Sequence, residues 1–475
     1  MKQKQIVRML AFVAIMLLLM PLRSMAVKIP VAILRTNADG KTKTLTFTYA
    51  ERPKVFARRG QNGVHKITQQ IPAIGYIPLP TKDPYVPTWL MDYWKNNLTI
   101  TTVVFDKSFS EFRPVSTSYW FNNLTKLRII KGIENLNTSN VKCMASMFSG
   151  CSSLTSVDVS GFNTSDVKDM SRMFWGCSSL TSIDVSGVNT SNVIDMGGMF
   201  NGCSSLTSID VSGFNTSNVK DMRGMFYGCS SLTSIDVSGF NTSNVEGMVG
   251  MFEGCSSLSN IDVSGFDASK VTTMYMMFMG CSSLKSINLS GFKTSEVEFM
   301  GRMFEGCSSL TSIDLSGLNT SKVRDMPSMF KGCSNLSTLN ICNFDISRMF
   351  NYSILYVVSH NNEEHLSYDE ITTYGPYVKF FNDSFRNIFQ GCSSLSTLYI
   401  GHNDFDNANE LFEKDNLFYG IGTSGRPCRL VVDSNFDKSV LADHIYTTSG
   451  EDNKPIYNWL GGYFTLDNSS ADARP

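Results

Sequence analysis

MFSGCSSLTSVDVSGFNTSDVKDMSR, residues 147–172, is the stretch that decides the fold, because the chain repeats it with little change. Further copies follow at a spacing of 26 residues, beginning at Met173, Met199, Met225, Met251, Met277, Met303 and Met329. A degenerate copy precedes them at residues 124–146, and a last copy begins at Ile388. Self-similarity at a fixed period of this length is the signature of a solenoid, in which successive turns of the chain stack on one another.

The first half of a unit has the pattern of a buried strand. Leu154, Val157 and Val159 follow L-x-x-V-x-V, which matches the strand of a leucine-rich repeat and predicts that their side chains turn inward. The polar side chains between them, including that of Asp158, are then expected to face solvent. Gly161 permits a corner after the strand.

The second half of a unit predicts a short helix. Its apolar residues fall at helical spacing between Val167 and Phe174. Ser165 or Asp166 can cap the first turn, where a carboxylate such as that of Asp169 is favourable. The glycine that follows Trp175 is expected to end the helix.

We therefore predict an α/β repeat solenoid: a leucine-rich-repeat-like array of 26-residue strand–helix units with β-rich caps. No unit can bury its apolar residues alone, so each must stack on its neighbours, with strands about 4.8 Å apart. Helices are wider than strands. The array is therefore expected to arc with its sheet on the inner face.

The changes in pattern along the chain divide it into six segments. They are a signal peptide (1–26), a β-rich segment with a Pro-rich linker (27–97), a cap with the degenerate first repeat (98–146), the solenoid (147–349), an insertion (350–387), and the last repeat with a C-terminal cap (388–475).

The first 26 residues have the features of a signal peptide. Basic residues precede an apolar core, Met9–Met20, which is shorter than the roughly 20 residues of a membrane span. Ser24-Met25-Ala26 places small residues where a signal peptidase cuts, so we expect cleavage after Ala26. The alternative is an uncleaved anchor helix. No second apolar run follows, so no membrane span is expected in the mature chain.

The charge and cysteine patterns narrow the range of partners. The net charge is −1 and charged residues make up 17%, so neither a nucleic acid nor an anionic membrane is indicated as a partner. Eight of the 12 cysteines recur every 26 residues, from Cys151 to Cys333, without a C-x-x-C pair. This spacing favours buried, reduced thiols over disulfides or zinc sites. Cys143, Cys342 and Cys428 depart from the spacing and are better candidates for oxidation.

One strand position carries a row of carboxylates that form the candidate ligand-binding site. The row consists of Asp158, Asp184, Asp210, Asp236, Asp262 and Asp314, with Asn288 interrupting it. Carboxylates opposite one another on neighbouring strands repel, and a cation or a basic or hydroxyl-rich ligand could offset this repulsion. The alternative is a solvated row that accepts hydrogen bonds from the flanking serines. Calcium needs 6–8 converging oxygens, so neither a metal nor a cofactor is predicted.

No residue pattern indicates catalysis. The repeat array contains no histidine, and the cluster from His360 to His365 in the insertion matches neither H-E-x-x-H nor H-x-x-E-H. We therefore interpret this cluster as a polar loop and predict that the protein is not an enzyme. The recurring Asn-Thr-Ser triplets match a glycosylation pattern, but they fall at a corner of each unit and are expected to be structural.

The repeat resembles that of the BspA-like leucine-rich-repeat surface proteins. The resemblance rests on GCSSLTSIDVSGFNTSNV (202–219), on VVFDKSF (103–109) and RPVSTSYWF (113–121) ahead of the array, and on WLGGYFTL (459–466). It covers roughly residues 98–405. It implies an exported protein of surface adhesion that binds extracellular matrix proteins or other cells. The shared residues are structural, so no binding residue is carried over.

Together these patterns predict an exported, adhesin-like binding protein that holds an extracellular protein or glycan, the host matrix, or other cells. The alternative is a structural component of a surface matrix without a specific ligand, and a metal-dependent hydrolase in the insertion ranks third. Two regions compete as the binding site: the Asp row on the repeated surface and the aromatic, irregular insertion at residues 350–385.

Overall fold

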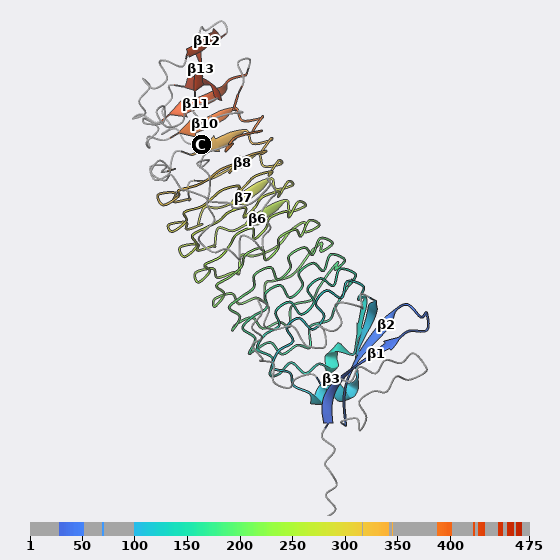
Figure 1. Ribbon diagram of the computed structural model, residues 1–475. Coiled ribbons are helices and arrows are strands. Elements are labelled where there is room, and N and C mark those ends of the chain that lie inside the picture. Colours follow the sequence, from blue (N-terminus) through green and yellow to red (C-terminus); the bar gives the residue numbers. More distant parts are fainter. Residues whose placement is uncertain are drawn as a thin grey trace, which may run out of the picture.

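The chain forms an elongated stack of coils between two sheets (Figure 1). The computed structural model describes residues 28–51, 69–70, 99–315, 317–341, 344, 387–400, 421–422, 426–432, 445–449, 454–459 and 462–467. The expected signal peptide and almost all of the expected insertion lie outside the described residues. In the described part, no helix is long and apolar enough to cross a membrane.

A five-stranded sheet in the order β3-β1-β2-β4-β5 precedes the coils. Its strands are β1 (Lys28–Thr36), β2 (Lys43–Glu51), β3 (Gln69–Gln70), β4 (Ile100–Phe105) and β5 (Ile129–Lys131). β2 pairs antiparallel with β1 and parallel with β4, which in turn pairs parallel with β5. The two segments that the sequence separated at residue 97 therefore contribute to one sheet.

An aromatic cluster joins this sheet to the first coil. The ring of Phe47 on β2 stacks on that of Phe105 at 5.0 Å and on that of Trp120 at 5.6 Å. Phe121 then stacks on Phe148 of the first full unit at 5.4 Å. Two 3-10 helices, η1 (Lys107–Glu111) and η2 (Ile133–Asn135), complete this cap.

The expected helix of each unit is absent, and this part of the prediction is wrong. Among the described residues none lies in an α-helix, and Val167–Phe174 form turns instead. Arg172 and Gly176, four residues apart, have left-handed φ angles of 54° and 67°, and the equivalent residues of the other coils share this conformation. A right-handed helix cannot pass through such residues.

The amide hydrogens of these turns bond alternately within the coil and to the next coil. The N–H of Arg172 donates to the carbonyl of Gly197 (2.8 Å) and that of Phe174 to Met199 (2.9 Å), both one coil further on. The N–H of Met173, which lies between these two residues, donates within the coil to the carbonyl of Met170 (3.3 Å). The spacing of the apolar side chains is therefore that of a stacked turn. Some of its backbone N–H groups donate to carbonyls of the next coil and the others donate within the coil.

The predicted strands are present in the later coils. They are β6 (Asn260–Asp262), β7 (Ser286–Asn288), β8 (Ser312–Ile313), β9 (Thr338–Asn340) and β10 (Thr397–Ile400). In the earlier coils the side chains alternate as predicted, but the cross-coil bond is long, 3.5 Å from Thr181 N to Thr155 O. The equivalent bond from Lys285 to Ser259 is 2.9 Å.

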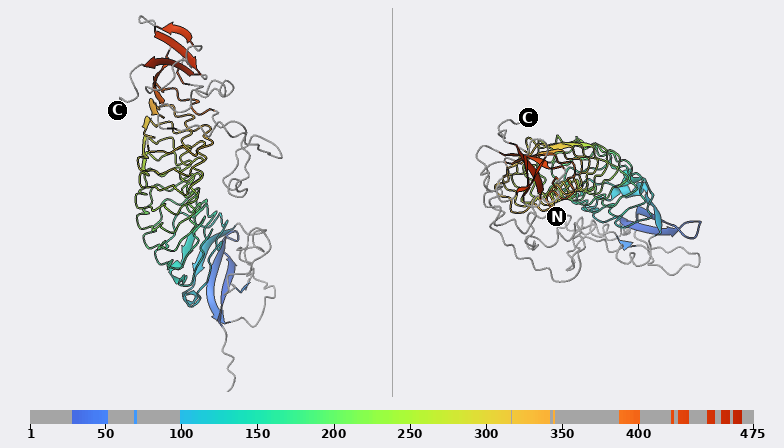
Figure 2. Two further views of the ribbon diagram at one scale, coloured as in Figure 1. Left: turned by 90° about the vertical axis from the view of Figure 1, so that its left-hand side faces the viewer. Right: turned by 90° about the horizontal axis from the view of Figure 1, so that it is seen from above.

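The stack is curved (Figure 2). We expected this arc because helices are wider than strands. Since each coil consists of turns and short strands, that reason does not apply to this array.

The core repeats itself from coil to coil. Phe148 stacks on Phe174 at 5.4 Å, and each later pair of phenylalanines up to Phe330 lies at 5.6–5.7 Å. The Cys177 thiol donates to the carbonyl of Phe148 (3.2 Å), and the other thiols of the array repeat this bond. The described cysteines are all free and those of the 26-residue spacing are buried, which confirms the predicted thiol ladder.

The last copy stacks directly on the coil that begins at Met329. Phe389 lies 6.0 Å from Phe330, and β10 pairs with β9, at a sequence offset of 59 residues instead of 26. The sheet continues with β11 (Cys428–Val432) and β14 (Gly462–Asp467), both parallel. β13 (Lys454–Trp459) and β12 (Ile445–Ser449) finish it as antiparallel strands, in the order β12-β13-β14-β11-β10-β9-β8.

Candidate functional site

The predicted aspartates lie at one exposed position of successive coils. We call this set, Asp158, Asp184, Asp210, Asp236, Asp262 and Asp314, the strand-face row. Asp158 Oδ1 accepts hydrogen bonds from the N–H (3.0 Å) and the hydroxyl (2.7 Å) of Ser160. The N–H groups of the serines after the next four aspartates donate in the same way, at 2.9–3.0 Å. Each of these carboxylates thus closes a local turn at the end of its strand segment.

These hydrogen bonds keep the carboxylates ionised. The side chain and then the N–H of the following serine lower the pKa of the first five aspartates of the row. The neighbouring carboxylate raises the pKa of Asp158, Asp184, Asp236 and Asp262, but it ranks below the serine bonds among the causes. The serines therefore offset the repulsion within the row.

Asn288 occupies this position in its coil and carries no charge. Its Oδ1 accepts from the N–H (3.2 Å) and the hydroxyl (2.9 Å) of Ser290, as an aspartate of the row does. The turn therefore needs an acceptor oxygen but no charge. The negative charges at the other positions exceed what the fold requires.

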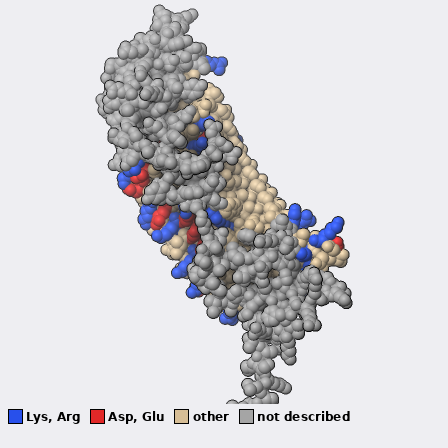
Figure 3. All heavy atoms as spheres, viewed as in Figure 1, with Lys and Arg blue, Asp and Glu red and all other residues tan. Residues whose placement is uncertain are grey.

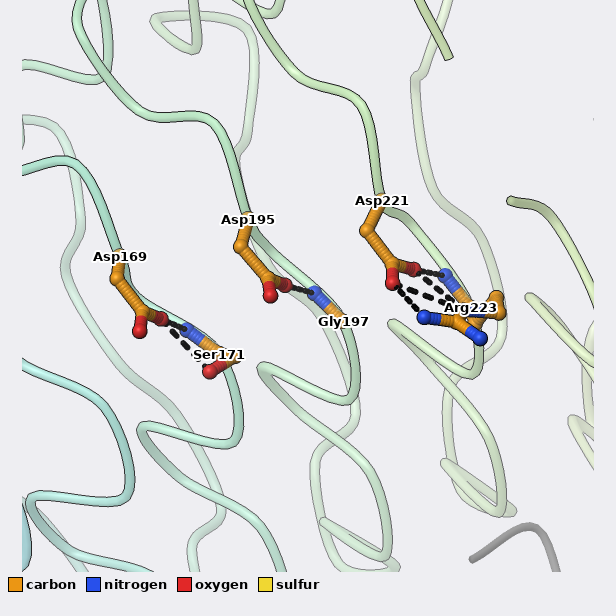
Figure 4. A network of polar contacts seen from close by, with 6 residues as sticks. All are labelled: Asp169, Ser171, Asp195, Gly197, Asp221 and Arg223. Carbon is orange, nitrogen blue, oxygen red and sulfur yellow. Dashed lines mark hydrogen bonds and ion pairs between the residues drawn. The ribbon is translucent and has the colours of Figure 1, made fainter. Parts of the chain in front are cut away.

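The structure also contains a second row of carboxylates, which the sequence analysis missed. Asp169, Asp195 and Asp221 are half-buried on three successive coils, and parallel β-bridges link them (Figure 4). We call them the turn-face row. We had assigned Asp169 to the first turn of a helix, although the spacing of 26 residues between these aspartates was a signal for stacking.

Each carboxylate of the turn-face row has a different partner. Asp169 accepts from the N–H (2.9 Å) and the hydroxyl of Ser171, and Asp195 accepts from the N–H of Gly197 (2.8 Å). Asp221 accepts from the N–H of Arg223 (2.9 Å) and forms an ion pair with its guanidinium. Among the described residues, Asp221 alone of the three has a positively charged partner.

Asp195 is the most perturbed member of this row. Burial, followed by the charges of Asp221 and Asp169, raises its pKa to about 6. Gly197 makes room for the carboxylates, because a Cβ there would lie 3.2 Å from Asp195 Oδ1 and 3.4 Å from Asp221 Oδ1. Among the described residues, no group of three or more His, Cys, Asp or Glu could hold a metal ion.

Cys143 stands at the head of the turn-face row, next to Asp169. The hydroxyl of Ser118 donates to its sulfur (3.0 Å), while its own thiol donates to Asp169 Oδ2 (3.4 Å). Burial and the Asp169 charge raise the pKa of this thiol to about 11, and burial raises that of Cys428 to about 12. Cys143 is half-buried whereas the cysteines of the ladder are buried, and greater oxidation of Cys143 and Cys428 stays a prediction. Cys342 lies outside the described residues.

The other sequence candidates divide into structural residues and residues outside the described part. Thr164 of one Asn-Thr-Ser triplet is buried, and its hydroxyl donates to the carbonyl of Asn189 (2.9 Å) and accepts from its N–H (2.8 Å). This triplet therefore bridges two coils, as expected. All five histidines, including those of the cluster from His360 to His365, lie outside the described residues.

Charged side chains gather along one edge of the visible face of the array, whereas much of the remaining visible surface of the coils is uncharged (Figure 3).

Three overlapping matches to one protein family cover most of the coils. They span residues 114–207, 181–286 and 257–369, more than half of the chain, and the family is described as "Mycoplasma protein of unknown function, DUF285". The chain belongs to the DUF285 family.

The matches to DUF285 begin in the N-terminal cap and end before the last copy of the repeat. Among solved structures, a leucine-rich repeat protein from Bacteroides ovatus ATCC 8483 matches with 18% identity, over 78% of this chain and 93% of that chain. Its TM-score is 0.25, which carries no argument, so the fold rests on the coil geometry described above. No curated protein matches the chain.

Proposed function

We propose that this DUF285 protein is an exported, surface-associated binding protein that holds an extracellular protein, a glycan or a cell along its strand-face row. The observation that carries the proposal is the excess charge of this row. Successive coils expose the same carboxylate–serine turn, and Asn288 fulfils the structural task without a charge. A weak contact on one coil would recur about every 4.8 Å along the array.

A repeated contact needs no deep pocket. Weak contacts that are linked along one ligand gain affinity through their effective concentration, and repeat arrays commonly bind through extended surfaces. Export is supported by the basic start and apolar core of residues 1–26, and adhesion by the resemblance to the BspA-like surface proteins. The proposal includes no catalytic step and no cofactor.

A second candidate function is a structural component of a surface matrix. It is favoured by the serine hydrogen bonds, which the first five aspartates of the row accept without a ligand. The two functions differ in one measurable respect: only the first requires a partner that recognises the charges.

The test compares the binding of three variants to a panel of matrix proteins, glycans and whole cells. The first changes Asp184, Asp210 and Asp236 to Asn, which keeps the acceptor oxygen and should preserve the fold, as Asn288 shows. The second replaces residues 352–383 with a short Gly-Ser loop. The matched control removes three exposed charges away from the row, through Glu134→Gln, Asp166→Asn and Glu246→Gln.

Loss of binding in the first variant alone is the expected result. Loss in the loop variant alone would move the site to the insertion, and equal loss in the control would reduce the effect to net charge. Full binding by all three variants would exclude both proposed sites, and a wild-type protein that binds nothing on the panel would favour the matrix role.

A further inference from the structure

The core of the array is almost the same at every junction between coils. The Phe148–Phe174 and Phe278–Phe304 pairs lie at 5.4 and 5.7 Å with rings inclined by only 3° and 2°. The thiol–carbonyl bonds are equally uniform, at 3.1–3.2 Å. These contacts stabilise any coil on any other coil, so they cannot specify which coil follows which.

The coils differ mainly in one part, which we call the turn face. It comprises the segment equivalent to Asp166–Trp175 in each coil. One of its positions is occupied in turn by Ser171, Gly197, Arg223, Val249, Tyr275, Gly301 and Pro327. The strand side of the same coils carries nearly the same residues throughout.

Large side chains of the turn face lie over glycines of a neighbouring coil. A Cβ on Gly301 would lie 2.8 Å from Cε2 of Tyr275 and 3.0 Å from Cδ of Pro327. A Cβ on Gly247 would lie 3.0 Å from Cγ of Arg223. These pairs are complementary in size only when the two coils are neighbours.

Charges of the turn face are also matched between neighbouring coils. Ion pairs join Lys220 to Glu246 (3.1 Å) and Arg324 to Glu298 (3.3 Å). Lys331 and Glu305 lie at 3.5 Å. The first pair is exposed and contributes little, whereas the other two are half-buried, and the pairs differ from one junction to the next.

We propose that the turn face fixes the order of the coils, while the uniform core supplies stability without order. A coil stacked on a wrong partner, whether by slippage or by exchange with another chain, would meet mismatched sizes and charges. This inference is independent of the proposed function, which concerns the strand-face row.

The first test is a pair of deletions that each remove one 26-residue unit with a closely similar core, residues 199–224 or 277–302. The first deletion brings Gly197 beside Val249, and these two residues are compatible in size. The second deletion brings Tyr275 beside Pro327, which are both large, and Lys270 beside Lys322, which carry the same charge. We expect the melting midpoint of the second variant to lie roughly 5 °C or more below that of the first.

A compensating variant separates mismatch from a general loss of strand pairing. In the full-length chain, Tyr275→Ala should lower the midpoint, because the ring packs over Gly301. In the chain lacking residues 277–302, the same change together with Lys270→Asn should raise the midpoint, or restore folding if the deletion alone abolishes it. Equal midpoints of the two deletions, or a compensating change that fails to rescue the second, would overturn the proposal.

A double-mutant cycle tests the same contact without a deletion. Gly301→Ala should be clearly destabilising in the wild-type chain and much less so once Tyr275 is alanine, when the contact with Cδ of Pro327 remains. Gly161→Ala is the control, because nothing lies within 4 Å of a Cβ at that position. Additive effects of the two changes would show that Tyr275 and Gly301 do not recognise each other.

Discussion

At the scale of single residues, stacking places aspartates of near-identical coils next to one another and changes how readily they ionise. Aspartates at one position of successive coils stay ionised on the strand face, where serines donate to them and water surrounds them. On the turn face the same stacking buries Asp195 between Asp169 and Asp221, and the pKa rises instead. The surroundings of a repeated residue therefore decide its chemistry, which the repeat pattern alone cannot show.

Asp195 should make the stability of the array depend on pH. Its folded-state pKa of about 6 lies above its ordinary value of 3.8, so its protonated form stabilises the fold below pH 3.8 and that stability is lost as the pH rises through 6. Asp195→Asn should therefore raise the melting midpoint at pH 7.5, with a gain that shrinks toward pH 4. Asp184→Asn, at a position of lowered pKa, is the control and should give no such gain. A gain independent of pH would contradict this prediction.

The cysteines of the array should be inert in the folded protein. Cys177, Cys229 and Cys307 are fully buried, and burial raises their thiol pKa to about 12. Iodoacetamide at pH 8 should leave these thiols unmodified under native conditions and label them after denaturation, as read by mass spectrometry. Cys143, which is half-buried, provides the internal comparison. Rapid native labelling from Cys177 to Cys307 would contradict the buried ladder.

At the scale of the element, the sequence predicted the strand half of the coil but not the turn half. The alternation of Leu154, Val157 and Val159 predicts inward side chains, and all three are buried. The spacing from Val167 to Phe174 is shared by a helix and by this stacked turn, because both bury residues three and four apart. The left-handed φ angles at Arg172 and Gly176 and the amide hydrogen bonds to the next coil distinguish them. An arginine gives no sequence signal of that conformation.

Replacing Gly198 with alanine should change the stability of the protein in opposite directions in a helix and in the observed turn. It occupies the position of Arg172 in the next coil and has a φ of 61°. In a helix, Gly198→Ala would stabilise the protein by up to about 1 kcal/mol. In the left-handed turn it should destabilise the protein by about 1–2 kcal/mol. Urea unfolding measures the difference, with Gly161→Ala as the control, and a more stable Gly198→Ala protein would contradict the observed turn.

At the scale of the whole molecule, the period of the repeat predicted a stack of coils and a last copy that begins at Ile388. The sequence could not show that this copy stacks directly on the Met329 coil, because the contact between Phe330 and Phe389 spans 59 residues. Nor could it place the strand-face row in relation to the turn-face row. That relation follows from the turns, which the sequence predicted as helices.

Removal of half a coil should be far more damaging than removal of a whole one. Deleting residues 212–224 removes the buried Phe214, Val219 and Met222, and leaves too little chain to complete a turn of the solenoid. We expect loss of the cooperative melting transition, measured by circular dichroism and size-exclusion chromatography, whereas the deletion of residues 199–224 should stay folded. Equal behaviour of the two variants would mean that the 26-residue unit is not the unit of stacking.

The even spacing of the phenylalanine stack has a mechanical consequence. Because the core contacts between coils are nearly equal in geometry, a pull on the two ends meets a series of similar joints. Each coil that opens releases up to roughly 90 Å of extended chain. A protein built this way would lengthen under load in equal steps, and could take up a sudden strain between two anchored points without breaking a covalent bond.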